Sequence, residues 1–183
     1  MKVIKIGGGC LKDGPAAKQI IDLIADRGQG NIFVLSAFYG ITDLLLSGID
    51  QALESEDNID TALEEIARRH RDIIPVLVQD PDRRETLARD LDRLWAKLER
   101  CLYGICFTRE ATPRMQDMVA TFGEQVSSLI LTAALAGMGC SSRCVFPETL
   151  GILSDGKFTD ASALMDPTSE NIRAWLDRNM TPD

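Results

Sequence analysis

Residues 1–36 read MKVIKIGGGCLKDGPAAKQIIDLIADRGQGNIFVLS, and this stretch decides the fold. Residues 2–6 form a short apolar run that three glycines interrupt, and residues 31–36 form a second apolar run bounded by turn residues. Between them, residues 15–27 place apolar side chains at helical spacing. The order strand, glycine turn, helix, strand predicts a βαβ unit with two parallel strands. We therefore expect an α/β fold with a mostly parallel sheet.

The composition is typical of a globular chain with an acidic balance. Of the 183 residues, 45% are hydrophobic, and the formal net charge is -8. A nucleic-acid-binding protein usually has a basic patch or a basic excess, so this class is not expected. The five cysteines include no C-x-x-C pair, and the single histidine, His70, does not complete a metal site. We expect free thiols in a reducing cytoplasm, no metal site, no signal peptide and no membrane span of ~20 apolar residues.

The chain that follows the second strand is predicted to be helical. Apolar residues recur at helical spacing over 41–54, 59–79 and 83–106. A short proline turn separates the last two helices, so they are predicted to form an αα-hairpin over about 57–107 that projects from the sheet.

The C-terminal third mixes helical and extended patterns. Thr112, followed by a proline, predicts the start of a helix that continues to about residue 137. Residues 141–146 predict a third strand, and residues 149–159 predict one or two further short strands. Thr168 is predicted to cap a final helix.

The first candidate site is the glycine turn after the first strand, Lys5-Ile6-Gly7-Gly8-Gly9-Cys10. Glycines allow backbone N–H groups to approach a phosphate closely, and a lysine adds a point charge. The motif is not a Walker motif, because the lysine precedes the glycines. A flexible glycine turn without a ligand is the alternative, and the residues alone favour neither.

The second candidate site lies between the second strand and the helix that follows it. Ser36 and Thr42 supply hydroxyl groups there, and the start of the helix supplies free N–H groups for a carboxylate. In open parallel sheets, ligands bind outside the carboxyl ends of the strands. The alternative is that Ser36 or Thr42 only caps the helix.

The third candidate site is Glu124, on a helix with apolar residues on two sides. Such a helix is expected to be buried, and a buried carboxylate needs a partner. A substrate ammonium group or a structural arginine would satisfy it. His70 shares a helical face with Ile66 and Ile73, so we expect a packed histidine rather than a catalytic acid or base.

Together the three segments resemble the aspartate kinases of the amino-acid kinase family. The family motifs K-F-G-G-T-S, S-A-x-x-G-[IV]-T and G-E-x-x-S are similar, in this order, to Lys5-Ile6-Gly7-Gly8, to Ser36-Ala37 with Gly40-Ile41-Thr42, and to Gly123-Glu124 with Ser127. The resemblance spans nearly the whole chain, and the second motif is the most specific. It implies a three-layer, mostly parallel sheet of the carbamate kinase-like type with an αα-hairpin insertion. Residues 1–183 would form a single domain, the N-terminal, amino-acid-binding part of the catalytic domain.

The resemblance also implies a reaction. ATP and L-aspartate would give ADP and 4-phospho-L-aspartate, with ATP bound as its Mg²⁺ complex and with no tightly bound cofactor. Such an enzyme serves the lysine, threonine and methionine pathways or the ectoine pathway. The implied roles are phosphoryl contact for Lys5, the phosphate path for Gly7, Gly8 and Gly9, and aspartate binding for Ser36, Thr42 and Glu124, with Glu124 near the ammonium group.

The sequence departs from the family pattern in two places. Gly9-Cys10 stands where the family has Thr-Ser, and the family's G-R-G-G-S-D segment, which carries an arginine for the substrate carboxylate, is absent from the 183 residues. We therefore expect a truncated form with negligible activity alone, which associates with a second copy through its sheet edge and hairpin. A kinase for another amino acid and a non-catalytic amino-acid-binding or interaction module are the alternatives.

Overall fold

The computed structural model describes residues 1–179, which fall into two compact units. The first unit is Met1–Arg143, and the second begins at Cys144. The first unit holds all three candidate segments, so the sheet and helices of that unit position the site.

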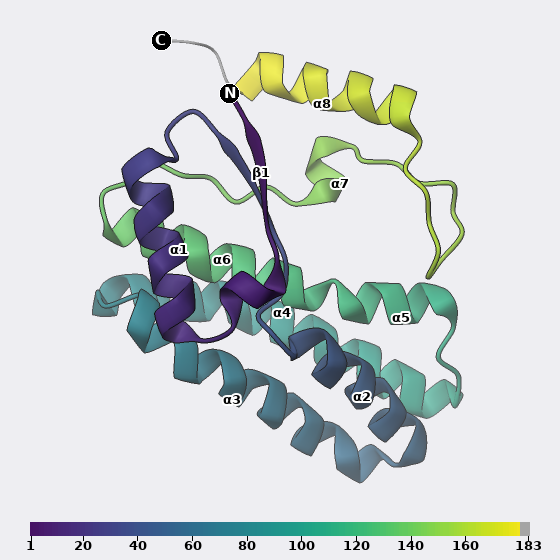
Figure 1. The fold of residues 1–183 in the computed structure, drawn as a ribbon. Helices are drawn as coiled ribbons and strands as arrows, with labels where there is room; N and C mark the ends of the chain where they lie inside the picture. The colour runs from purple at the N-terminus through teal and green to yellow at the C-terminus, as the bar shows by residue number, and fades with distance from the viewer. Residues whose placement is uncertain (180–183) are drawn as a thin grey trace. The chain divides into compact units, whose positions relative to one another are not determined.

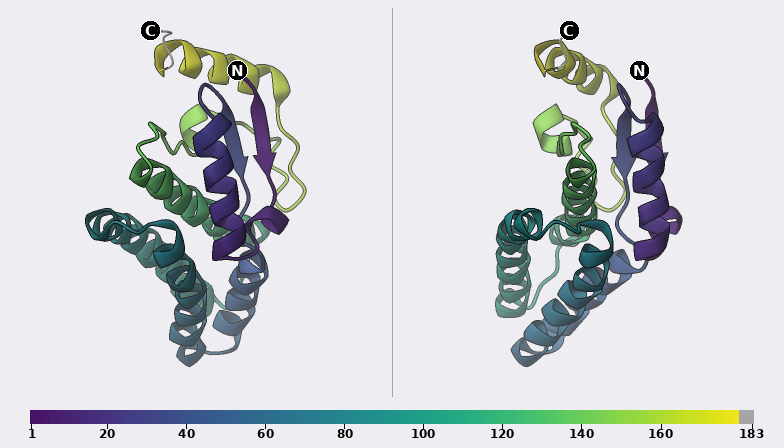
Figure 2. Two further views of the ribbon diagram at one scale, coloured as in Figure 1. Left: turned by 60° about the vertical axis from the view of Figure 1, so that its left-hand side comes forward. Right: turned by 90° about the vertical axis from the view of Figure 1, so that its left-hand side faces the viewer.

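The first unit contains a two-stranded parallel sheet. Strand β1 (Val3–Ile6) pairs with β2 (Ile32–Leu35) in a register that sets Ile6 opposite Leu35. Helix α1 (Gly14–Arg27) joins the strands and runs beside them in Figures 1 and 2. Its start is fixed by Asp13, whose carboxylate accepts a hydrogen bond of 2.8 Å from the backbone N–H of Ala16. The predicted βαβ unit is confirmed.

The two faces of this sheet differ in burial. Ile6 is 7% exposed and belongs to the hydrophobic core, which also contains Ile21 of α1. On the opposite face, Val3 is 67% exposed and Val34 is 49% exposed. Strand residues alternate between faces, so the core of the first unit lies on the Ile6 side only.

Three helices continue the first unit beyond the carboxyl ends of the strands (Figure 1). They are α2 (Ile41–Glu54), α3 (Ile59–Leu77) and α4 (Pro81–Thr108), and a short 3₁₀ turn, η2 (Glu56–Asn58), precedes α3. The predicted helices over 41–54, 59–79 and 83–106 are thus confirmed within a few residues. Their shared core contains several fully buried aliphatic side chains, among them Leu45, Ile66, Leu98, Leu102 and Ile105.

The helix predicted from Thr112 to about residue 137 is two helices. Thr112 caps α5 (Pro113–Ala120) as expected, but α6 (Phe122–Gly137) begins after a break at Thr121. The Thr121 hydroxyl donates a 2.8 Å hydrogen bond to the carbonyl of Met118, a local bond that competes with the helical backbone pattern. By length and composition, residues 113–137 are apolar enough to cross a membrane, yet half of their most apolar stretch of 18 residues is buried inside the fold. Packing therefore accounts for its apolar character.

The chain after α6 is less regular than the sequence predicts. Residues 141–146 form no strand, and α7 (Pro147–Leu150) follows them directly. Proline fixes its own φ at a helical value and opens a helix readily, so Pro147 ends the extended stretch. Within 149–159 the strand prediction reduces to one isolated antiparallel bridge between Ser154 and Ala163.

The last helix also begins earlier than predicted. Helix α8 spans Met165–Asn179, so Thr168 lies inside its first turn and does not cap it. The Thr168 hydroxyl is 3.0 Å from the N–H of Leu153 and 3.3 Å from its carbonyl. The hydroxyl therefore ties α8 to the extended chain of the same unit.

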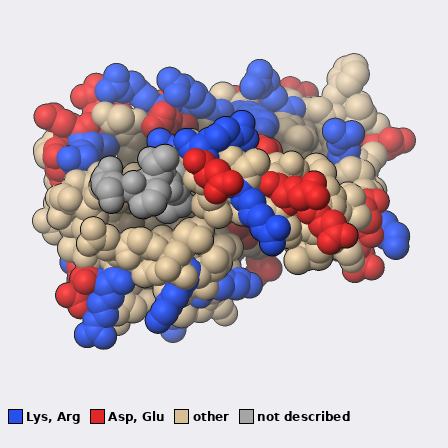
Figure 3. Space-filling model, turned by 90° about the horizontal axis from the view of Figure 1, so that it is seen from above, with Lys and Arg blue, Asp and Glu red and all other residues tan. Residues whose placement is uncertain are grey.

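Charged side chains of both signs are interspersed on the face drawn in Figure 3. Ion pairs of the described residues join side chains that are mostly well exposed, such as Lys18 with Asp22 at 2.5 Å. Exposed pairs of this kind contribute at most about 1 kcal/mol each, so the fold depends on its aliphatic core.

Candidate functional site

The carboxyl ends of both strands meet at one point, because the strands are parallel and in register. The backbone N–H of Ser36 donates a 3.0 Å hydrogen bond to the carbonyl of Ile6 and extends the ladder past β2. Gly7 and Ser36 therefore leave the sheet side by side. This is the edge where open α/β sheets bind their ligands.

The glycine segment after β1 is an ordered turn. Gly7 is extended, and a 3₁₀ helix, η1 (Gly8–Leu11), follows it. The N–H of Cys10 donates to the carbonyl of Gly7 at 2.9 Å. A Cβ on Gly8 would lie 3.2 Å from the carbonyl oxygen of Ala37, so a glycine allows close contact between the first and second candidate segments. Lys5 is exposed and precedes this turn by two residues.

The second segment turns from β2 into α2 at Gly40. Gly40 caps α2 with φ of 78°, a left-handed conformation that glycine adopts without steric cost. No side chain makes a capping hydrogen bond at this helix start, so neither Ser36 nor Thr42 caps α2. Both are half-buried. The N–H of Ile41 donates to the carbonyl of Phe38 at 3.1 Å, whereas the N–H groups of Thr42 and Asp43 have no carbonyl partner within the helix and can face a ligand.

The third segment reaches the other two through Gly123, at the start of α6. A Cβ on Gly123 would lie 2.6 Å from the Cβ of Ala37 and 3.3 Å from a methyl carbon of Ile41. Only glycine allows α6 to approach this closely. Glu124 follows in the first turn of α6 and is half-buried rather than fully buried as predicted. Residues 1–179 supply no ion pair to its carboxylate, so the structural arginine considered from the sequence is absent from this part of the chain.

Ser127 connects the second and third segments and was not predicted as a site residue. It is fully buried, and its hydroxyl donates a 2.9 Å hydrogen bond to the carbonyl of Ser36. The same hydroxyl lies 3.1 Å from the carbonyl of Glu124. A serine three residues after the glutamate on an apolar helix was the available signal, because a buried hydroxyl requires a partner.

His70 is packed in the core, as the sequence indicated. It is 1% exposed, its Nδ1 lies 2.8 Å from the carbonyl of Ile66, and its ring lies between Phe38 and Trp95, 5.9 and 5.4 Å away between centroids. Burial lowers the pKa of His70 from 6.5 to about 4; the hydrogen bond with Ile66 opposes this shift, and the charge of Arg69 adds to it. The neutral, buried imidazole of His70 therefore packs against Phe38, which lies in the segment after β2.

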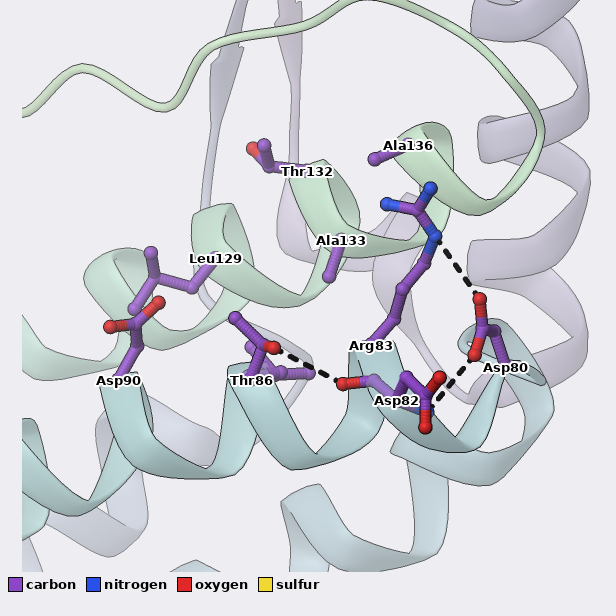
Figure 4. Close-up of a pocket in the computed structure, with 10 residues that line it drawn as sticks. Asp80, Asp82, Arg83, Thr86, Asp90, Leu129, Thr132, Ala133 and Ala136 are labelled. Carbon is purple, nitrogen blue, oxygen red and sulfur yellow. Dashed lines mark hydrogen bonds and ion pairs between the residues drawn. The ribbon is translucent and has the colours of Figure 1, made fainter.

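A surface pocket lies elsewhere in the first unit. It has a volume of about 420 Å³ and lies between the start of α4 and one face of α6 (Figure 4). Arg83 reaches from α4 toward Ala136 of α6 and is held by Asp80 at 3.4 Å. None of the residues predicted for the site lines this pocket. Within residues 1–179, no three His, Cys, Asp or Glu side chains gather as a metal site either.

Comparison with known proteins decides the family. The model of the amino acid kinase family matches residues 1–182. The chain belongs to this family. Among curated relatives, aspartokinase 1, chloroplastic, of Arabidopsis thaliana is 27% identical over 166 residues, which are 88% of this chain and 28% of that protein. The bifunctional aspartokinase/homoserine dehydrogenase 1, chloroplastic, of Zea mays is 28% identical over 155 residues, 82% of this chain and 16% of that protein.

Two solved structures of an aspartokinase have the same fold as this chain. Aspartokinase III of E. coli, in complex with lysine and aspartate, superposes with a TM-score of 0.82 at 19% identity, over 97% of this chain and 38% of that chain. Its complex with aspartate and ADP gives a TM-score of 0.80 at 19% identity, over the whole of this chain and 38% of that chain. The predicted fold class and the resemblance to the N-terminal catalytic part of aspartate kinases are confirmed.

Proposed function

We propose that this chain binds L-aspartate at the carboxyl ends of β1 and β2 and presents its side-chain carboxylate to Mg²⁺-bound ATP. One observation carries the proposal: three segments far apart in the sequence meet at this edge. Gly8 and Gly123 both contact Ala37, and Ser127 is hydrogen-bonded to Ser36. Each segment contributes one of the motifs that resemble those of aspartate kinases.

The residues around this point divide into an amino-acid end and a phosphate end. Glu124 is a carboxylate without a protein partner in the described chain, and it suits a substrate ammonium group. The hydroxyl groups of Ser36 and Thr42, with the N–H groups of Thr42 and Asp43 at the start of α2, suit a substrate carboxylate. The ammonium group of the amino acid would then face a carboxylate and its carboxylate would face hydrogen-bond donors, and this difference fixes the orientation of the substrate.

The phosphate end consists of Lys5 and the glycine turn. A Cβ on Gly7 or Gly9 would meet nothing within 4 Å, so backbone N–H groups of the turn Gly7-Gly8-Gly9 can face phosphate oxygens, and Lys5 supplies positive charge. In the proposed step, an oxygen of the aspartate side-chain carboxylate attacks the γ-phosphorus as the bond to the leaving ADP oxygen breaks. Such transfers are accelerated mainly by positioning and by charge stabilisation. Mg²⁺ would enter with the nucleotide as part of the substrate.

Binding of L-aspartate to the 183-residue chain, measured by titration calorimetry, tests this proposal. We expect Glu124→Gln to weaken binding about tenfold or more, because a hydrogen bond to a charged group contributes about 1.5–3 kcal/mol. Glu110→Gln is the matched control, since Glu110 is an exposed residue of the turn between α4 and α5. Equal affinity of both variants would contradict the role of Glu124. Tighter binding of another amino acid would favour a kinase for that substrate.

Catalysis is tested separately from binding, because the chain spans only 28% of its Arabidopsis relative. A coupled assay of ADP release with aspartate, ATP and Mg²⁺ would detect turnover. Aspartate binding with no ADP release would favour the non-catalytic amino-acid-binding module. We further propose a reducing cytoplasm as the location, which the five free cysteines support.

A further inference from the structure

The hydrogen bond of Ser127 is the one polar link between α6 and the carboxyl end of β2 that the described chain shows. Its donor is fully buried, and its acceptor, the carbonyl of Ser36, lies 91 residues earlier in the sequence. Ser36 is also bound on its other side, because its N–H donates to Ile6. Residue 36 is therefore held between β1 and α6.

We propose that Ser127 is a positioning residue for amino-acid recognition, which sets the distance between Glu124 and the Ser36–Thr42 segment. The inference rests on the proposed function, and it adds a residue that touches no substrate. One hydroxyl lies within hydrogen-bond distance of both carbonyls, that of Ser36 and that of Glu124. A rotation or shift of α6 would therefore break the contact with Ser36 while Glu124 moved.

The packing around this bond leaves α6 little freedom to compensate. Gly123 lies against Ala37 with no space for a side chain, so α6 cannot move closer to the loop. Within residues 1–179, the hydrogen bond from Ser127 to Ser36 is the polar contact that opposes motion of α6 away from the loop. A misplacement of about 1 Å can slow an enzymatic reaction about 100-fold, so a smaller displacement of Glu124 should weaken aspartate binding about tenfold.

The test compares Ser127→Ala with Ser128→Ala in titrations with L-aspartate and, separately, with Mg²⁺-ADP. Ser128 is the matched control: it is the next residue of α6, it is half-buried, and no hydrogen bond of its hydroxyl is found in residues 1–179. We expect Ser127→Ala to raise the Kd for aspartate about tenfold and to leave the Kd for the nucleotide unchanged. Ser128→Ala should leave both constants unchanged. Ser127→Cys, similar in size but a weak donor, should give an intermediate Kd and serves if the alanine variant does not fold.

A second measurement separates positioning from mere stabilisation of the fold. If Ser127 acts by placing Glu124 against Ser36, then Ser127→Ala should raise the Kd less in a Glu124→Gln background than in the native chain. Additive effects, or a loss of thermal stability with unchanged aspartate affinity, would overturn the inference and leave the proposed function standing. A native chain that binds no aspartate would overturn the proposed function itself, and the inference with it.

Discussion

Replacing Gly123 with alanine should push α6 away from the segment after β2. The new Cβ would lie 2.6 Å from the Cβ of Ala37 and 3.3 Å from a methyl carbon of Ile41. Carbon atoms in contact are ordinarily about 3.5–4.0 Å apart, so the overlap with Ala37 is about 1 Å. Both neighbours are buried, so neither can swing into solvent.

Two opposing effects set the size of the change. Alanine in place of glycine stabilises a helix interior by up to about 1 kcal/mol. Overpacking a buried contact costs about 1–3 kcal/mol. Because the overlap involves a Cβ next to the backbone rather than the end of a flexible side chain, the steric cost should exceed the helix-propensity gain. We expect a net loss of about 1–2 kcal/mol in the free energy of unfolding.

Urea unfolding followed by circular dichroism measures this loss directly. Gly104→Ala is the matched control, because Gly104 lies within α4 and a Cβ there would meet nothing within 4 Å. It should be neutral or stabilising. Ala37→Gly removes the nearer of the two obstructing groups, so the double variant should recover part of the loss. A Gly123→Ala protein as stable as the Gly104→Ala protein would refute the close approach of α6.

Three further predictions concern pH, a helix end and assembly. Burial lowers the pKa of His70 from 6.5 to about 4, so the stability that neutral His70 contributes is full above pH 6.5 and is lost as the pH falls to about 4. At about 1.4 kcal/mol per pKa unit, the free energy of unfolding should fall by about 3 kcal/mol over this range. Urea unfolding at several pH values should show this loss for the native chain and not for His70→Phe. Arg109 donates to the carbonyls of Leu53 at 3.1 Å and Glu54 at 3.4 Å, which end α2, so Arg109→Ala should lower the free energy of unfolding by about 1 kcal/mol. The control Arg100→Ala loses a bond to Ala96 in its own helix and should not lower it. Equal stability of the two variants would contradict the role of Arg109 in capping the end of α2. The exposed sheet face around Val3 and Val34 should favour a homo-oligomer, and a strict monomer in light scattering across a dilution series would contradict this.

The sequence predicts the elements formed by local patterns. Apolar runs on either side of a helical repeat predicted β1, α1 and β2, and helical spacing predicted α2, α3 and α4. Predictions were wrong where local signals conflict, as at Pro147, which follows an apolar stretch and opens α7. Thr121 divides the predicted helix through a hydrogen bond to the turn before it, which no repeat of apolar residues shows.

The candidate site divides in the same way. The strand ends at Lys5 and Ser36 were predicted, because a parallel arrangement fixes where they meet. The contact of Gly123 with Ala37 and the hydrogen bond from Ser127 depend on how α6 packs against the segment after β2, and local sequence patterns do not reveal this packing. The roles of the individual residues stay predictions until binding is measured.

The span of the Ser127 bond also has a consequence for the order in which the protein folds. It joins residues 91 positions apart, and such long-range contacts carry a loop-closure cost that helices formed from local contacts do not. During synthesis, α1 through α4 can form before α6 has left the ribosome, but a nascent chain that stops short of Ser127 lacks one side of the proposed amino-acid site. A ligand that binds this pocket therefore recognises only chains in which α6 has docked, and by mass action it shifts the population toward them. If the proposed site binds L-aspartate, the free amino acid would therefore favour chains in which α6 has docked.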